Sequence, residues 1–357
     1  GDSDSVINIG LMYQLGDGVE ADNKKAEEYF QKAINMGSIH ALYRLAKLYE
    51  EGDNPDWEEI RKLYQKAAEM GDGEAMHMLG EIYWADDSPF RDYEKAMDWF
   101  CKAVDAGNVE AIEHVGLMYH FGLGVECNYE EAMKWYQRAA DEGNAEAMYR
   151  IASLYEHGEG VEKDYQEAAT WLQKAAELDY DEAIRALGSY YRSGLGVKRD
   201  YKKAMELFKQ AAELENAEAM FCIAIMYENG EGVEQNYQEA VAWLQKAVEL
   251  NHDKALKELG LFYYYGHGVE QNYEKALKFS KQAAELKNAE AMFTIAVMYE
   301  NGEGVEQNYQ EAATWLRKAA ELNHDRAITE LGYFYYNGHG VEQNYKKAME
   351  LFKQAAE

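Results

Sequence analysis

The sequence is short of proline, cysteine and long apolar runs, and each shortage removes a class of structure. Proline occurs only at Pro55 and Pro89, so long stretches can stay helical without a kink. The three cysteines are an odd number without a recurring spacing, which excludes a disulfide framework. No apolar run is long enough to cross a membrane, and no charged and then apolar leader opens the chain. We therefore expect a soluble protein, cytoplasmic, or secreted or periplasmic if a leader has been trimmed.

Basic residues are also scarce in comparison with acidic ones. The 36 Lys and Arg residues face 66 Asp and Glu residues, which leaves a formal net charge of −30. Such a chain repels phosphate backbones and anionic lipid headgroups, so we expect no nucleic-acid partner and no direct membrane insertion. Two interpretations of the acidic excess stay open. It steers basic segments of a protein partner towards the chain, or it only keeps a long helical array in solution.

A fixed period is the main positive signal in the sequence. Residues 228–240 recur letter for letter at 300–312, which is 72 residues later, and a close variant lies between them at 265–273. The unit is therefore 36 residues long, which is typical of a stacked repeat array. A tyrosine late in each first helix marks ten units, with steps of 36 residues except for one of 34: Tyr13, Tyr49, Tyr83, Tyr119, Tyr155, Tyr191, Tyr227, Tyr263, Tyr299 and Tyr335.

These units leave no room for another domain, so we predict one solenoid domain over residues 1–357. Its repeats are expected to begin near residues 5, 41, 75, 111, 147, 183, 219, 255, 291 and 327. From the fifth repeat onward two types of unit alternate, and this 72-residue super-period indicates the duplication of a pair.

Each unit is predicted to hold two amphipathic helices joined by a glycine turn. In the unit that begins at Ala219, the apolar residues at plus four, plus five and plus eight fall on one helix face. Small residues at zero and plus five would let a neighbouring helix approach closely. Gly230 is predicted to end the first helix, because glycine tolerates the left-handed conformation. Asn236 is expected to cap the second helix, with Glu239 completing a capping box.

The repeated residues carry a family resemblance. The unit reads Ala-x₃-Leu-Gly/Ala-x₂-Tyr-x₂-Gly-x-Gly-Val and continues as Asn/Asp-Tyr-x₂-Ala-x₂-Trp-x₂-Lys-Ala-Ala, and Gly-x-Gly-Val stands in eight of the ten repeats. This pattern resembles the Sel-one-like (Sel1-like) repeat, a relative of the tetratricopeptide repeat. The resemblance implies an all-α fold, a right-handed superhelical α/α solenoid of about ten 36-residue helix-turn-helix repeats. It also implies that the first helices line the concave side.

Repeats two and three depart from this pattern. Repeat two carries Gly52-Asp-Asn-Pro55 and is 34 residues long, and repeat three carries Asp86-Asp-Ser-Pro89. Both loops lack the second glycine and the valine. We therefore expect a different local turn in each, and these loops are the first candidates for a bend or hinge.

No motif in the sequence indicates catalysis or a cofactor. Of the nine histidines, His267 and His339 lie in glycine turns, while His252 and His324 lie between repeats. We find no histidine matched with a second ligand at i+3 or i+4 in a metal-binding pattern, so we predict no metal site and no cofactor. Gly-x-Gly-Val lacks the preceding strand and the third glycine of a dinucleotide fingerprint. No base or paired thiol is recognisable beside any cysteine.

The remaining candidate site is the first-helix face opposite the core, at plus two, plus six and plus nine. Its residues are mixed and polar in the N-terminal repeats and turn apolar or aromatic in the C-terminal half. An exposed apolar patch marks a binding surface. The alternative is that tight winding buries plus two and plus six against the next repeat. The predicted partner-binding residues are Trp84, Phe221, Ile225, Leu261, Tyr264, Phe293, Val297, Tyr333 and Tyr336.

These observations predict a non-enzymatic protein–protein interaction scaffold that binds a polypeptide, favouring basic segments, in the concave groove. The resemblance implies a bacterial signalling or host-interaction role. One alternative is the penicillin-binding or β-lactamase-like activity proposed for cysteine-rich relatives of the family, although those relatives pair two cysteines in each repeat and this chain does not. Another is a structural array that associates end to end, because neither end carries an obvious polar cap.

Overall fold

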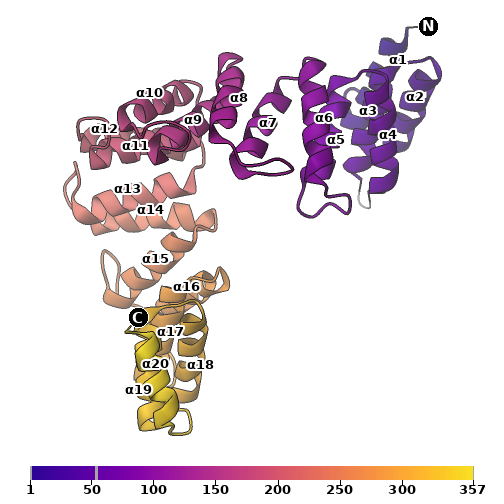
Figure 1. The fold of residues 1–357 in the computed structure, drawn as a ribbon. Helices are drawn as coiled ribbons and strands as arrows, with labels where there is room; N and C mark the ends of the chain where they lie inside the picture. Colours follow the sequence, from indigo (N-terminus) through magenta and orange to yellow (C-terminus); the bar gives the residue numbers. More distant parts are fainter. Residues whose placement is uncertain (1, 53–54, 357) are drawn as a thin grey trace. The chain divides into compact units, whose positions relative to one another are not determined.

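A computed structural model describes residues 2–52 and 55–356. Within these ranges there are 20 helices and no strand (Figure 1), which confirms the all-α prediction. The helices form ten consecutive pairs, one pair in each predicted repeat. None of the helices in the described ranges combines the length and the apolar character needed to cross a bilayer.

Interhelical contacts divide the chain into two compact units, Gly1–Leu178 and Asp179–Glu357. The first unit holds α1 (Ser3–Leu15), α2 (Asn23–Asn35), α3 (Ile39–Glu50), α4 (Trp57–Glu69), α5 (Gly73–Trp84), α6 (Tyr93–Asp105), α7 (Glu110–Phe121), α8 (Tyr129–Asp141), α9 (Ala145–His157) and α10 (Tyr165–Ala176). The second unit holds α11 (Asp181–Ser193), α12 (Tyr201–Glu213), α13 (Ala217–Asn229), α14 (Tyr237–Glu249), α15 (Asp253–Tyr265), α16 (Tyr273–Glu285), α17 (Ala289–Asn301), α18 (Tyr309–Glu321), α19 (Asp325–Asn337) and α20 (Tyr345–Gln354). A single continuous domain over 1–357 stays a prediction.

The same packing scheme recurs within each unit. The second helix of a repeat packs along the first helix of its own repeat and also contacts the first helix of the next repeat. In the first unit, for example, α6 packs on α5 and contacts α7. A first helix therefore meets neighbours on both sides, and this arrangement requires small residues on its core stripe.

Each hairpin core matches a small residue on the first helix with a larger one on the second. Gly188 is buried against Phe208, and a Cβ added to Gly188 would lie 2.8 Å from Cε1 of that ring. The same match of glycine with an aromatic ring recurs at Gly10 and Phe30, Gly80 and Phe100, Gly116 and Tyr136, and Gly332 and Phe352. At the equivalent positions of other repeats, buried alanine stands with buried leucine: Ala152 and Leu172, Ala224 and Leu244, and Ala296 and Leu316.

The glycine turn of the regular repeats forms as predicted. Gly230 ends α13 with φ 69° and ψ 33°, and its N–H donates to the carbonyl of Met226. Gly232, with φ 72°, lies so close to the preceding repeat that a Cβ there would be 2.6 Å from Cβ of Tyr201, the first residue of α12. The second glycine of the turn is therefore needed both for its conformation and for this close approach.

The helix caps also form as predicted. The Asn236 side chain accepts hydrogen bonds from the N–H groups of Gln238 and Glu239, at 3.0 and 3.1 Å. Residues between repeats cap several first helices in the same way, and Asn216 accepts from the N–H of Ala219 at 2.8 Å. These contacts satisfy amide groups that a helix start leaves free.

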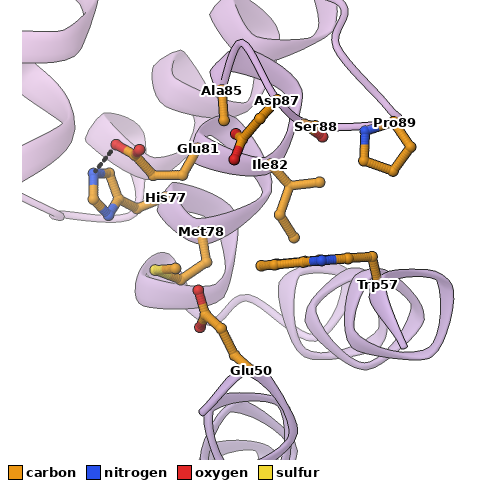
Figure 2. Close-up of a pocket in the computed structure, with 10 residues that line it drawn as sticks. All are labelled: Glu50, Trp57, His77, Met78, Glu81, Ile82, Ala85, Asp87, Ser88 and Pro89. Carbon is orange, nitrogen blue, oxygen red and sulfur yellow. Dashed lines mark ion pairs between the residues drawn. The ribbon is translucent and has the colours of Figure 1, made fainter. Parts of the chain in front are cut away.

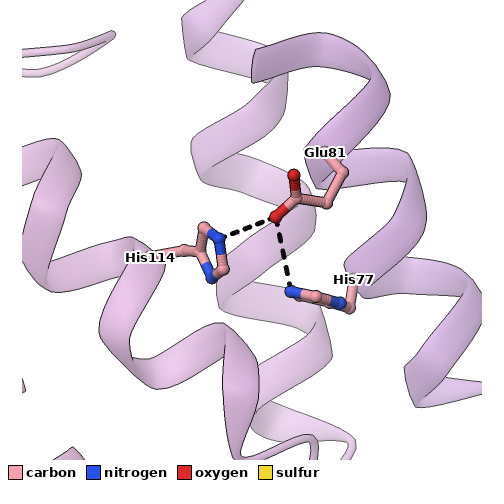
Figure 3. Close-up of side chains that lie close together, drawn as sticks. All are labelled: His77, Glu81 and His114. Carbon is pink, nitrogen blue, oxygen red and sulfur yellow. Dashed lines mark ion pairs between the residues drawn. The ribbon is translucent and has the colours of Figure 1, made fainter. Parts of the chain in front are cut away.

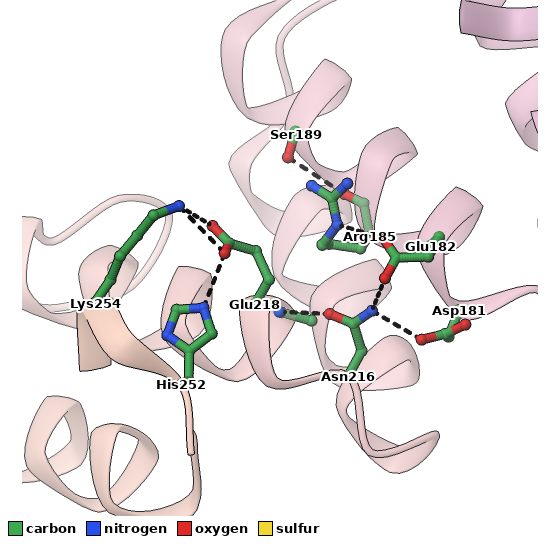
Figure 4. A network of polar contacts seen from close by, with 9 residues as sticks. Asp181, Glu182, Arg185, Ser189, Asn216, Glu218, His252 and Lys254 are labelled. Carbon is green, nitrogen blue, oxygen red and sulfur yellow. Dashed lines mark hydrogen bonds and ion pairs between the residues drawn. The ribbon is translucent and has the colours of Figure 1, made fainter. Parts of the chain in front are cut away.

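In the second unit, the caps Asn216 and His252 also tie their repeats to the one before (Figure 4). Asn216 donates to Asp181 Oδ2 at 2.8 Å, and one repeat later His252 Nε2 lies 2.8 Å from Glu218 Oε2. Lys254 adds a second contact to Glu218, at 3.1 Å. The junctions of this part of the second unit therefore alternate between a carboxamide and an imidazole, following the 72-residue super-period of the sequence.

The first helices of repeats two and three end differently from those of the regular repeats, as their sequences predict. The C-cap of α3 is Glu51 in the right-handed helical region, and the C-cap of α5 is Ala85 in an extended conformation, with φ −60° and ψ 135°. Neither uses the left-handed glycine cap. Within the loop Gly52–Pro55, residues 53–54 lie outside the described residues. A bend or hinge at these loops stays a prediction.

Candidate functional site

A pocket of about 400 Å³ lies in the first unit, beside the irregular loop of repeat three (Figure 2). It is formed by the end of α3, the start of α4, one face of α5 and the loop after α5. Its lining residues are Glu50, Trp57, His77, Met78, Glu81, Ile82, Ala85, Asp87, Ser88 and Pro89.

The departure from the glycine turn explains why the pocket is open. In repeat four, Gly124 lies so close to Tyr93, the first residue of the preceding second helix, that a Cβ would collide with the Tyr93 carbonyl. The equivalent residues one repeat earlier are Ser88 and Trp57. Because Ser88 carries a Cβ, its loop cannot lie against α4 as closely as Gly124 lies against α6. The Trp57 indole forms a wall of the pocket and is 37 % exposed.

The pocket combines an apolar floor with acidic groups. Trp57, Met78 and Ile82 supply apolar surface, while Glu50 and Asp87 supply carboxylates, and Figure 2 shows these side chains around one space. The Glu50 carboxylate also accepts from the Tyr64 hydroxyl at 3.0 Å and pairs with Lys47 at 3.1 Å. A long apolar side chain that ends in a cation is the group that best matches such a lining.

Two residues of the pocket also belong to a cluster that joins repeats three and four (Figure 3). His77 and Glu81 lie on α5, one turn apart, and His114 comes from α7. Glu81 Oε1 lies 2.7 Å from His114 Nε2 and 3.6 Å from His77 Nε2. The cluster therefore brings two imidazoles to one carboxylate oxygen.

The surroundings of the cluster set the charge of its members. Burial and the charge of His114 lower the pKa of His77. Burial opposes charge on His114 too, but the hydrogen bond to Glu81 and the Glu81 charge raise the pKa of His114 above its usual value. Although burial raises it, the pKa of Glu81 is lowered on balance by the His114 hydrogen bond and by both imidazoles. Burial therefore favours the neutral form of His77, and the contact with Glu81 favours the protonated form of His114 in the metal-free protein.

Trp84, a predicted partner-binding residue, is half-buried against this cluster. Its ring meets the edge of the His114 ring at a centroid distance of 5.0 Å, while Phe100 stacks on the other ring face at 4.7 Å. Trp84 therefore helps to fix the His114 ring in place. Its contact with a partner stays a prediction.

The predicted plus-two aromatics of the second unit are covered by the next repeat. Phe221 is half-buried and stacks on His252 at 5.2 Å. Phe293 is only 7 % exposed, because His324 stacks on its ring and the Arg326 guanidinium lies 4.6 Å from its centroid. The expectation that Phe293 presents a free ring is therefore corrected, and the alternative of burial against the next repeat holds at this position.

The remaining predicted residues differ in exposure. Ile225, Leu261 and Val297 are half-buried. Tyr264 is half-buried as well, and its hydroxyl donates to Glu303 of the following repeat at 2.6 Å. Tyr333 and Tyr336, on α19, are 50 % and 52 % exposed. A role of these residues in partner binding stays a prediction.

The cluster on α5 and α7 is not visible in a ligand pattern confined to one helix. One partner is visible in the sequence, since Glu81 follows His77 by four residues, so the expectation that no histidine has a second ligand at i+4 is wrong at this position. The second imidazole lies 37 residues after the first and comes from the neighbouring repeat. Comparing the same helix face in consecutive repeats would have brought the three residues together.

Comparison with known families covers the whole repeat region. The model of the Sel1 repeat matches ten consecutive segments, at residues 3–38, 39–72, 73–108, 109–144, 145–180, 181–216, 217–252, 253–288, 289–324 and 325–357. The chain belongs to the Sel1 repeat family. The helix pairs of the structure fall one in each matched segment, and the short second segment is one of the two repeats that lack the regular glycine turn.

Two solved Sel1 repeat structures are similar to this chain. A protective antigen of uropathogenic Escherichia coli strains is 28 % identical, covers 100 % of this chain and 84 % of its own, and superposes with a TM-score of 0.66. A Sel1 repeat protein from Oxalobacter formigenes is 31 % identical over 70 % of this chain and 99 % of its own, with a TM-score of 0.63. No curated protein matches this chain. Sel1 repeat proteins generally serve as protein-interaction scaffolds.

Proposed function

We propose that this Sel1-repeat protein is a non-enzymatic scaffold that binds a polypeptide, with its main contact in the pocket beside Trp57. The observation that carries the proposal is the lining of that pocket, where an exposed indole and aliphatic side chains lie next to carboxylates. The partner segment is one that presents a lysine or arginine close to an apolar residue. The protective-antigen relative supports a bacterial host-interaction setting for such a scaffold.

The pocket chemistry favours a basic side chain over a purely apolar one. The methylene stem of a lysine or arginine can pack on Trp57 and Met78, while its cation faces Glu50 and Asp87. A cation over an indole contributes about 0.5–1 kcal/mol of favourable interaction energy at an exposed site, and more when water is excluded. The net charge of −30 attracts such a segment from a distance and speeds its association at low salt.

The second unit offers further contacts to a long partner. Tyr333 and Tyr336 are each about half exposed on α19. Tyr345 on α20 is 60 % exposed, and its ring lies 5.3 Å from that of Tyr336. Aromatic side chains of this kind are enriched among residues that dominate binding energy. We propose Tyr333 and Tyr336 as a separate partner contact on the second unit, and the half-buried residues of the predicted set as contacts within their own units.

A random peptide library displayed on phage and selected on the full chain tests the proposal. We expect enriched peptides with a basic residue beside an apolar one. Their affinity, measured by fluorescence anisotropy, should fall about tenfold or more in Trp57→Ala, because truncating an aromatic residue at the centre of an interface costs this much binding free energy. Binding should weaken with rising salt, because the carboxylates of the pocket attract the cation.

Tyr309→Ala is the matched control. Tyr309 begins α18 at the position equivalent to Trp57 and is also 37 % exposed, but it lies in a repeat with a regular glycine turn. Its replacement should leave peptide affinity unchanged. Enriched peptides that bind Trp57→Ala as tightly as the unchanged protein would refute the proposed pocket, and a library without enrichment would refute peptide binding itself.

A further inference from the structure

The cluster of His77, Glu81 and His114 places three atoms of metal-ligand type together. The donor atoms all lie within 4.8 Å of one another. Two neutral imidazole nitrogens and one carboxylate oxygen make up a set that zinc enzymes also use, with a fourth position open. The two supporting helices, α5 and α7, belong to neighbouring repeats of the same unit.

The distances are close to those of a bound ion. Metal–ligand bonds of 2.0–2.1 Å in a tetrahedral site put the donor atoms about 3.3 Å apart. Glu81 Oε1 is 2.7 Å from one imidazole nitrogen and 3.6 Å from the other, so the observed separations lie on either side of that value. The separation of the two imidazole nitrogens is within 4.8 Å, so rotation of the side chains would be needed to bring all three donors to bonding distance.

The orientation of both rings suits coordination through Nε2. His114 Nδ1 lies 3.1 Å from the backbone carbonyl of Glu110, and donation of Nδ1–H to that oxygen turns Nε2 towards Glu81. A backbone carbonyl in this place is a usual outer partner of a metal-binding histidine. His77 Nε2 is buried and has no hydrogen-bond partner within residues 2–52 and 55–356. A buried polar atom of this kind requires an explanation, and a metal ion supplies one.

The site is rigid on one side and open on the other. Phe100 and Trp84 pack on the His114 ring from the core side. Glu81 is the most exposed of the three side chains, and both Glu81 and His77 line the pocket beside Trp57. The cluster therefore borders the pocket, and water or a ligand group can approach it from the side of Glu81.

We propose that His77, Glu81 and His114 bind a divalent transition-metal ion, with zinc as the best match to two imidazoles and one carboxylate. Magnesium and calcium prefer sites built from oxygen ligands, so they do not fit this set. The inference does not depend on peptide binding by the pocket. The competing description is that the Glu81–His114 contact is only an ion pair, with a proton in the place of the metal.

Calorimetric titration of the full chain with ZnCl₂ after removal of metals by a chelator tests the site. We expect one high-affinity zinc per chain, released protons on binding, and visible absorption bands of tetrahedral cobalt when Co²⁺ replaces zinc. His77→Ala and His114→Ala should each weaken zinc binding by more than about a hundredfold, since the loss of an outer-shell partner alone costs about tenfold to a hundredfold. Glu81→Gln keeps the shape and hydrogen-bonding ability of the side chain, and it should also lose the cobalt bands.

His252→Ala is the control for a histidine that pairs with a glutamate without a second imidazole. His252 lies 2.8 Å from Glu218, and its replacement should leave zinc affinity unchanged. Circular dichroism melts of each variant would establish that it is folded. The absence of zinc binding and of cobalt bands in the unchanged protein overturns the proposal and leaves the ion pair alone. Zinc binding that survives in both His77→Ala and His114→Ala overturns it as well.

Discussion

An exchange of side-chain size across one hairpin would measure how strongly the repeat core depends on matched volumes. Gly188 on α11 lies against Phe208 on α12, whereas the next repeat has Ala224 and Leu244 at the same positions. Gly188→Ala alone should destabilise the hairpin although alanine favours helix, because its methyl group would lie 2.8 Å from the ring. Phe208→Leu alone should destabilise it through lost apolar contact.

The magnitudes follow from these contacts. Overpacking by one methyl group lowers the stability by about 1–3 kcal/mol. The higher helix propensity of alanine offsets about 1 kcal/mol of this loss. Loss of part of the Phe208 ring costs about 1–2 kcal/mol. The double variant re-creates the alanine and leucine match of the next repeat and should be nearly as stable as the unchanged protein. The coupling free energy between the two sites is therefore about 2 kcal/mol in favour of the pair.

Hydrogen exchange of the amides in α11 and α12 is the suitable assay, because a repeat array does not unfold in one step. The double variant should exchange about 30-fold more slowly than additive effects of the single changes would give. The reverse exchange, A224G with L244F in α13 and α14, serves as the control and should show coupling of the same sign. Strictly additive effects in both hairpins would refute the argument from matched volumes.

Three further predictions concern pH and the proposed interface. The hydrogen bond from His252 lowers the pKa of Glu218 to about 2, so Glu218 stabilises the fold above its unperturbed value of 4.5, and this stability is lost as pH falls from about 4.5 towards 2. Glu218→Gln should reduce, by about 1 kcal/mol, the fall in opening free energy of α13 and α15 that hydrogen exchange measures between pH 4.5 and 2, since solvent screens a partly exposed pair. An unchanged dependence on pH contradicts this. Replacing residues 88–89 by Gly-Val should let the loop close on α4, and peptide anisotropy should show a loss of pocket binding with an unchanged melting temperature. Changing both Tyr333 and Tyr336 to serine should weaken a long partner several-fold in the same assay without loss of helicity by circular dichroism, and equal affinity would remove them from the interface.

The sequence predicts the parts of the fold that local chemistry decides. Gly230 and Asn236 mark a helix end and a helix start because their side chains, or the lack of one, act within a few residues. The irregular turn at Asp86–Pro89 was predicted for the same reason. The period of the apolar residues alone identifies which face of each first helix packs in the core.

Contacts between neighbouring repeats could not be predicted in the same way. The pocket depends on the distance between Ser88 and Trp57, and the burial of Phe293 depends on side chains of the following repeat. Both follow from the register of one hairpin on the next, which a period of 36 residues does not specify. The cluster of His77 with His114 has the same origin.

The copied junctions of the second unit have an evolutionary consequence. Glu218 with His252 and Glu290 with His324 make the same contact at the same distance of 2.8 Å, 72 residues apart. A further pair of repeats inserted between them would meet on both sides the partners that it already recognises. Unequal recombination within the gene can therefore lengthen or shorten the protein by one pair of repeats without introducing a new type of junction between repeats.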